Sequence, residues 1–168
     1  MAIMIALDTG LRLEGIIGLE WSHIRDGVVR RVVKRKKEVE IPLTDRLKVE
    51  LPAYQAAMEV PSLNWVFPSP EDPSKHRHQN FHETFQAACS RAGIFVTKAD
   101  GTKKNFRFHD LLHTFATKAL RRGINVKAVQ LLLGHSSLTM TQKYAHVDLN
   151  DLKAAMKLFD ERRETTED

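Results

Sequence analysis

The sequence predicts a mainly α-helical domain with one small antiparallel β-sheet, an α+β fold. Apolar residues recur at helical spacing along most of the chain, whereas residues 28–33 and 39–43 alternate in the way that is typical of strands. The chain has 168 residues, of which 42% are hydrophobic and 28% are charged. This length and composition are typical of one globular domain with a core of its own.

Two short helices are expected before the strands. The apolar run at residues 4–7 predicts the end of a helix, which Thr9 and Gly10 close because glycine readily takes the left-handed conformation that ends helices. Leucine and isoleucine then recur along residues 12–19 at the spacing of a second, short helix. A basic KRKK turn joins the two strands that follow.

The middle of the chain is expected to hold two longer helices. Thr44 is a suitable N-cap for the first, and Pro52 should bend or divide it because proline lacks the backbone N–H and crowds the preceding turn. Residues 65–67 are predicted to be a short strand or a buried anchor. A polar loop follows, and residues 80–93 are predicted to form the second helix.

The C-terminal half is expected to be helical after an irregular start. Residues 94–107 are predicted to be irregular and basic. The segments 110–123 and 126–133 are predicted helices, and each is followed or closed by a glycine. Tyr144 lies in a further short helical segment, and residues 152–159 have the apolar spacing of a final amphipathic helix that docks on another surface.

The charge of the chain is positive and unevenly distributed. The net charge is +5, and seven basic residues fall between Arg25 and Lys37. Residues 160–168 hold five acids and two arginines, so the positive excess lies in the rest of the chain. A concentration of this kind indicates a face that binds a polyanion, and a solvated hairpin is the alternative interpretation.

Several classes of protein find no support in the sequence. The single cysteine, Cys89, excludes an internal disulfide and fits a reducing cytoplasm. The opening MAIMIALDTG has no basic start and is too short for a signal peptide or a membrane helix. None of the motifs G-x-x-x-x-G-K, G-x-S-x-G and H-E-x-x-H occurs.

The segment 109–146 carries the most specific pattern. His109 stands where a helix is expected to start, His135 follows a glycine that ends a helix, and Tyr144 lies nine residues further on. Each residue alone has an ordinary structural explanation: a polar helix start, a loop residue, a half-buried aromatic. Their combination at these separations is far more specific than any one of them.

This pattern resembles the catalytic domain of the tyrosine recombinases, the phage-integrase and Xer-like family. The family carries H-x-x-R-H at a helix start, then L-G-H-S, then the tyrosine, and this chain has HDLLH from His109, LGHS around His135, and Tyr144. Upstream, TGLRLEGIIGLEW resembles the first-arginine motif with Arg12 in the catalytic place. VVKRKKEVEIPLT resembles the lysine hairpin, in which Lys34 is a better match than Lys36 or Lys37.

The resemblance implies the DNA breaking-rejoining fold and a covalent mechanism without a cofactor. Tyr144 would attack a phosphodiester and form a 3′-phosphotyrosyl link, and Arg12 would hold a phosphoryl oxygen. His109 would take part in proton transfer or orient the phosphate, and His135 would donate a hydrogen bond to it. Lys34, at the hairpin tip in the minor groove, would protonate the departing 5′ oxygen.

One element of the family pattern is missing, because Leu112 stands where the second catalytic arginine should be. Leucine has neither charge nor hydrogen-bond donor. Arg107 precedes the helix, and Arg121 and Arg122 lie near its far end, so rescue by these residues is not expected. Two functions therefore stay open: site-specific DNA recombination or integration with impaired activity, or an inactive DNA-binding relic or regulator with the same fold. Type IB topoisomerases share the chemistry, but the LGHS motif favours a recombinase.

The resemblance also sets expectations for domains and partners. Residues 1–160 are expected to be a catalytic domain that is truncated at its N-terminus and lacks the core-binding domain, and residues 161–168 a charged, disordered tail. The expected partner is double-stranded DNA, with a tetramer on paired sites, a monomer or weak dimer when free, and no membrane contact. We expect a cytoplasmic protein, bacterial or phage-derived and nucleoid-associated. The residues predicted to contact DNA are Arg30, Arg31, Arg35, Lys36, Lys37, Lys103 and Lys104.

A metal site is not expected. His76, His78 and His82 lie close together in the sequence, and the last two could share a helix face. There is no cysteine or second histidine pair at a useful spacing, so contact of this histidine-rich loop with solvent or DNA phosphate is the simpler interpretation. His113 is expected to support the catalytic residues without acting on DNA itself.

Overall fold

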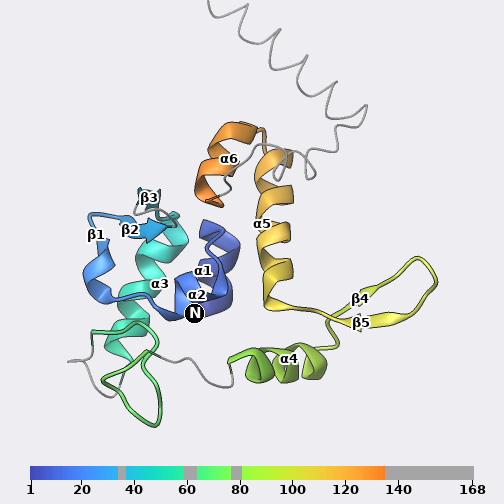
Figure 1. Cartoon of the computed structure of the whole chain (residues 1–168), viewed down its shortest axis with the longest axis horizontal. Coiled ribbons are helices and arrows are strands. Elements are labelled where there is room, and N and C mark those ends of the chain that lie inside the picture. The colour runs from blue at the N-terminus through green and yellow to red at the C-terminus, as the bar shows by residue number, and fades with distance from the viewer. Residues whose placement is uncertain (34–36, 59–63, 77–80, 135–168) are drawn as a thin grey trace, which may run out of the picture.

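The computed structural model describes residues 1–33, 37–58, 64–76 and 81–134, and of residues 31–39 it describes no side chains. Helices and two small sheets make up this part of the chain, as Figure 1 shows. The helices are α1 (Ala2–Thr9), α2 (Leu13–Ile17), the 3₁₀ turn η1 (Trp21–His23), α3 (Asp45–Ala56), α4 (Phe81–Arg91), α5 (Phe108–Arg121) and α6 (Val126–Leu132). The strands are β1 (Ile24–Arg25), β2 (Val28–Val33), β3 (Lys37–Pro42), β4 (Phe95–Thr97) and β5 (Lys103–Asn105). The mainly helical α+β prediction is confirmed.

The first sheet is the antiparallel sheet that the sequence predicts. Its order is β1-β2-β3, and Val29 pairs with Ile41 in the β2–β3 ladder. Both of these side chains are buried, because alternate positions of each strand face the core. Asp26 (φ 54°) and Gly27 (φ 73°) adopt left-handed conformations between β1 and β2, as a tight turn between antiparallel strands requires.

Helix α3 begins where its cap is predicted. The Leu47 amide donates to Thr44 Oγ1 at 3.3 Å, and the helix continues to Ala56. Pro52 lies inside this single helix, so it does not divide the helix, and the expected bend stays a prediction. Its missing N–H removes one hydrogen bond, to the carbonyl of Lys48, and the remaining bonds and the buried Leu51 keep the helix together.

The main hydrophobic core lies where α1, α2, the first sheet and α3 meet. Its most deeply buried side chains include Ile5, Leu19 and Leu47. Residues 65–67 are the predicted buried anchor: Val66 is buried in this core, and Trp65 forms an isolated antiparallel bridge with Glu20. Within the described residues, no helix is both long enough and apolar enough to cross a membrane.

The region between α4 and α5 differs from the prediction. Residues 94–107 were expected to be irregular, but β4 and β5 pair antiparallel and form a second, two-stranded sheet. The expectation of one sheet is therefore wrong. All residues of these two strands are exposed, so the alternation of buried and polar side chains that reveals a strand in the sequence is absent.

Helix α5 begins earlier than predicted. Its first residue is Phe108, and Arg107 is the N-cap, so Asp110 lies in the first turn and does not begin the helix. Gly123 (φ 76°) follows its end, and the Asn125 side chain caps α6 by accepting from the Lys127 amide at 2.7 Å. The helical segments expected around Tyr144 and at residues 152–159 lie outside the described residues.

Candidate active site

Gly10 is the point where α1, α5 and α6 come together. It ends α1 in the left-handed conformation (φ 70°), and an added Cβ would lie 2.6 Å from Phe115 Cδ1 and 2.9 Å from Leu133 Cδ2. Only glycine fits such a close approach of three elements. The packing therefore brings together the segments that carry three of the predicted motifs: Arg12 two residues after Gly10, the first turns of α5, and the end of α6.

Arg12 stands at the start of α2. It is the N-cap residue, with an extended backbone (φ −72°, ψ 160°), and its side chain is exposed. The preceding residues are held firmly, because Thr9 is fully buried and its hydroxyl donates to the Ile5 carbonyl at 2.6 Å. The same hydroxyl oxygen accepts from the Leu11 amide at 3.2 Å. A rigid backbone thus presents a guanidinium that is open to solvent or to a ligand.

His109 lies in the first turn of α5 and is exposed. The ring of His113, one helical turn further on, meets it edge to face, with the ring centroids 4.9 Å apart. His113 thus packs against the His109 ring, and its supporting role stays a prediction. A solvent-facing imidazole on a helix start is able to orient a phosphate or exchange a proton with it.

Asp110 joins the start of α5 to the chain before it. Burial raises the pKa of this carboxyl, but hydrogen bonds from the backbone amide and the guanidinium of Arg107, together with the positive charges nearby, outweigh burial and lower the pKa. The Arg107 amide donates at 2.8 Å, and its Nη2 donates at 3.2 Å. Arg107 thus pairs with Asp110 at the start of α5, and that it does not replace the missing arginine stays a prediction.

Leu112 is a core residue in this structure. Its side chain is 3% exposed and belongs to a small apolar cluster between α5 and α6. The other buried members of this cluster are Phe115, Ala116, Ala119, Val129 and Leu133. Arg121 is nine residues further along the helix, which is roughly 13 Å of axial rise, so it lies far from the first turn.

The described residues include only part of the predicted site. Arg12, His109 and Leu112 are described, and the packing at Gly10 brings their segments close together. Lys34, His135 and Tyr144 lie outside the described residues. Gly10 is the residue of this region whose importance the sequence did not reveal beyond a helix stop. A signal was available, since Thr9 and Gly10 open the first-arginine motif TGLRLEGIIGLEW.

The predicted DNA-binding residues fall into three groups. Arg30 Nε donates to Glu40 Oε1 at 2.8 Å in a cross-strand pair, so its charge is partly compensated. Lys103 and Lys104 are exposed on β5. The side chains of the remaining predicted residues lie outside the described part: Arg31, Arg35, Lys36 and Lys37.

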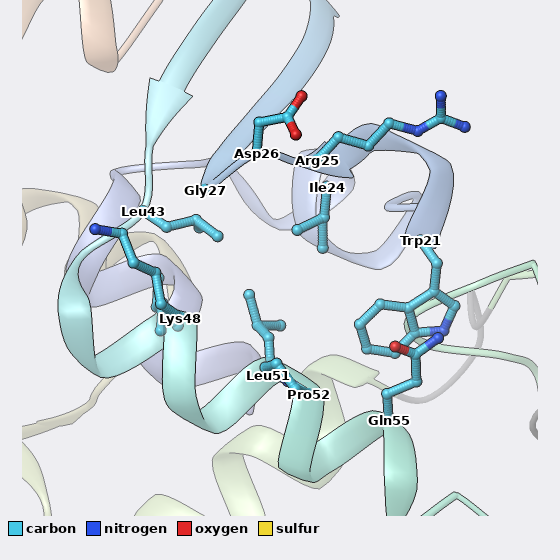
Figure 2. Close-up of a pocket in the computed structure, with 11 residues that line it drawn as sticks. Trp21, Ile24, Arg25, Asp26, Gly27, Leu43, Lys48, Leu51, Pro52 and Gln55 are labelled. Atoms are coloured by element: carbon cyan, nitrogen blue, oxygen red, sulfur yellow. The ribbon is translucent and has the colours of Figure 1, made fainter.

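A pocket of about 380 Å³ lies between α3 and the segment that runs from η1 to the β1–β2 turn. Figure 2 shows Leu51 and Trp21 on its apolar side and the cations Arg25 and Lys48 at its edge. Lys48 Nζ is paired with Asp45 at 2.9 Å. No predicted catalytic residue lines this pocket, so it is not the site to which the motifs point.

Metal ligands do not gather in the part of the chain that the structure describes, where no group of three His, Cys, Asp or Glu side chains could hold an ion. His82, the last of the three neighbouring histidines, lies on α4. Its ring Nε2 is 3.0 Å from Nε2 of the Gln86 side chain on the same helix. The Cys89 thiol is buried, and burial raises its pKa, which disfavours the thiolate.

Comparison with known proteins identifies the family. Residues 1–151 match the model of the phage integrase family. Tyrosine recombinase XerD of Proteus mirabilis is 36% identical over 151 residues, which cover 86% of this chain and 46% of XerD. The chain thus spans about half the length of the curated relatives it matches.

Solved structures of integrases share the fold. The catalytic domain of bacteriophage HP1 integrase superposes with a TM-score of 0.62 at 27% identity, over 93% of this chain and 79% of that domain. The integrase of transposon Tn1549, in complex with transposon right end DNA, has a TM-score of 0.74 at 20% identity, over 95% of this chain and 58% of that one. From the sequence match and the shared fold, the chain belongs to the phage integrase family of tyrosine recombinases.

Proposed function

We propose that the chain acts in site-specific DNA recombination or integration as the catalytic part of a tyrosine recombinase. The observation that carries this proposal is the close packing at Gly10, which joins the segments of Arg12 and His109 to the end of α6, two residues before His135. Residues 1–160 form the catalytic domain, and residues 161–168 form its charged tail. The motif order around Tyr144 supports the same assignment.

In the proposed reaction Tyr144 is the nucleophile. Its phenolic oxygen attacks the scissile phosphorus, the bond from phosphorus to the 5′ oxygen breaks, and a 3′-phosphotyrosyl link forms. The phenol has an ordinary pKa of about 10, so it must lose its proton during attack. Lys34 supplies the proton that the departing 5′ oxygen takes up. Attack of a 5′ hydroxyl on the link then reverses these steps and rejoins the strand, so no cofactor is needed.

The described residues serve the phosphate in this proposal. Arg12 is exposed on a rigid backbone, and its planar guanidinium can hold a non-bridging oxygen with two hydrogen bonds. His109 accepts the proton that Tyr144 loses or orients the phosphate, and the His113 ring packs against it. His135 donates a further hydrogen bond.

A second candidate function is favoured by Leu112. This side chain is buried among apolar neighbours where the family pattern has an arginine, so one phosphoryl oxygen loses a cationic partner. Losing one such donor costs roughly 10² to 10³ in rate. An inactive DNA-binding relic or regulator with the same fold is therefore the alternative to a slow recombinase.

The partner in both functions is double-stranded DNA. The net charge of +5 and the basic β2–β3 hairpin support this, as does the bound DNA in the related Tn1549 integrase complex. We propose a monomer or weak dimer in solution and a tetramer on paired sites. The protein would act in the cytoplasm, associated with the nucleoid.

Trapping the covalent intermediate tests the proposed function. The chain, alone and fused to the N-terminal half of Proteus mirabilis XerD, is incubated with nicked duplexes that lose the leaving strand after cleavage. A recombinase gives an adduct on denaturing gels, and Tyr144→Phe, which keeps the ring but removes the nucleophile, gives none. DNA binding without any adduct supports the inactive regulator, and no DNA binding contradicts both functions.

A further inference from the structure

The β4–β5 hairpin is a ribbon without cover from the rest of the described chain. Figure 1 shows it projecting beyond α4 and α5. Its base is tied to the body where Asn105 Nδ2 donates to Gln86 Oε1 at 3.4 Å. Beyond this point the apolar residues are uncovered: Ile94 is 47% exposed, Phe95 36% and Val96 37%. A two-stranded ribbon is marginally stable alone, so a surface of this kind is suited to a partner.

The tip of the hairpin is a turn that the Asp100 carboxylate stabilises by hydrogen bonds. Asp100 Oδ1 accepts from the Thr102 amide at 2.8 Å and from its hydroxyl at 2.6 Å. These hydrogen bonds lower the pKa of Asp100 and keep it ionised. Gly101 (φ 80°) completes the turn, and the Lys98 amide donates to the Thr102 carbonyl at 2.9 Å. The acid therefore holds the turn and does not neutralise the lysines.

Lysine and apolar side chains occur together on both faces of the ribbon. Phe95 pairs with Asn105, and Thr97 pairs with Lys103, so Phe95 and Lys103 are diagonal neighbours on one face. Lys103 Nζ lies 5.6 Å from the centre of the Phe95 ring. On the other face Val96 is directly opposite Lys104. Among the described residues no acidic side chain forms an ion pair with these lysines.

We propose that the β4–β5 hairpin is a DNA-binding arm that lies in the major groove of duplex DNA. None of the recombinase motifs lies in this hairpin. The inference rests on the proposed function, because it requires that the chain binds DNA. The groove is about 12 Å wide and admits a two-stranded ribbon. Lys103 and Lys104, one on each face, reach the phosphates of the two groove walls.

Charge distinguishes DNA from a second copy of the chain as the partner that binds the hairpin. A second copy has the same net charge of +5 and the same basic ribbon, so hairpin-to-hairpin contact places like charges together. DNA offers a regular array of negative charges. The two lysines, which form no ion pair among the described residues, therefore favour DNA.

Salt-dependent binding of the full chain to a mixed-sequence duplex, measured by fluorescence anisotropy, tests the proposal. Lys103→Gln with Lys104→Gln should weaken binding about tenfold and reduce the slope of log affinity against log salt by about two, one for each lost phosphate contact. The matched control is Lys118→Gln with Arg121→Gln, which removes two exposed charges near the far end of α5. This control should change the slope by less than about half of the change expected for one lost phosphate contact.

Chemical footprinting identifies the groove. Methylation of guanine N7, which faces the major groove, should be reduced by the unmodified chain at positions where the Lys103 and Lys104 double variant gives no protection. Equal slopes for the double variant and the control overturn the arm, as does unchanged N7 methylation. If Phe95→Ala dissociates a dimer in sedimentation while DNA affinity is unchanged, the occupant is a second copy and the proposal is wrong. Failure of the unmodified chain to bind any duplex contradicts the proposed function as well, so the two failures are distinguishable.

Discussion

The start of α2 and the first turns of α5 form two sides of the candidate site. They differ at the positions where the family pattern has its two catalytic arginines. Arg12 is retained, exposed, and placed on a backbone that buried Thr9 holds by two hydrogen bonds. Leu112 replaces the arginine and is 3% exposed in an apolar cluster. The side chain at position 12 is therefore open to solvent, while the side chain at position 112 is part of the packing between α5 and α6.

The largest effect is expected from restoring the arginine at the packed position. Leu112→Arg should destabilise the chain by about 3 kcal/mol, because a cation then replaces a buried leucine that has no acidic partner in its cluster. Leu112→Met keeps the volume and the apolar character and should cost under about 1.5 kcal/mol. Urea denaturation of both variants measures this. Equal stability of the arginine variant and the unmodified chain would show that the side chain reaches solvent.

Substitution of Gly10, where the two sides of the site meet, should destabilise the chain nearly as much. Gly10→Ala places a Cβ 2.6 Å from the Phe115 ring at a positive φ, and we expect a loss of about 2 to 3 kcal/mol. Gly123→Ala is the matched control, because its φ is also positive (76°) but nothing lies within 4 Å of the added Cβ. It should cost about 1 kcal/mol. Similar losses for both would mean that the close packing at Gly10 has little energetic weight.

The smallest of these effects concerns the cap of α5. Asp110→Asn removes the charge that accepts from Arg107 and should cost about 1 kcal/mol at neutral pH. Since the folded-state pKa of Asp110 is lowered below 3.8, its contribution is present above that value and is lost as pH falls through the folded-state pKa. Thermal melts of both proteins should therefore converge in acid. A constant difference down to acid pH would contradict this.

Local rules predicted most of the fold. The Thr44 cap, the Gly10 helix end and the alternation of the first sheet are each determined by a few neighbouring residues, and all appear where expected. The second sheet was missed because hydrophobic periodicity detects a strand only when one face is buried, and β4 and β5 are exposed on both faces. The Asp100-Gly101 turn was the signal that remained in the sequence.

The site could be predicted in type but not in packing. Motif spacing predicts Arg12 and His109 as site residues, and the packing at Gly10 brings their segments together. Sequence alone showed that Leu112 lacks a charge, but not that it is a core residue, because this depends on which face of α5 meets α6. The same holds for Gly10, whose need to be glycine comes from Phe115 and Leu133, both more than a hundred residues away.

Adduct formation by Leu112→Arg tests the central claim most directly, namely that the site is complete except for one cationic group. Both this variant and the unmodified protein, each fused to the XerD N-terminal half, are given the same nicked duplex, and the rate is normalised to the folded fraction. We expect the arginine to raise the rate of Tyr144–DNA adduct formation by about two orders of magnitude or more. Equal rates in the two proteins would show that another group supplies the charge and would contradict the account.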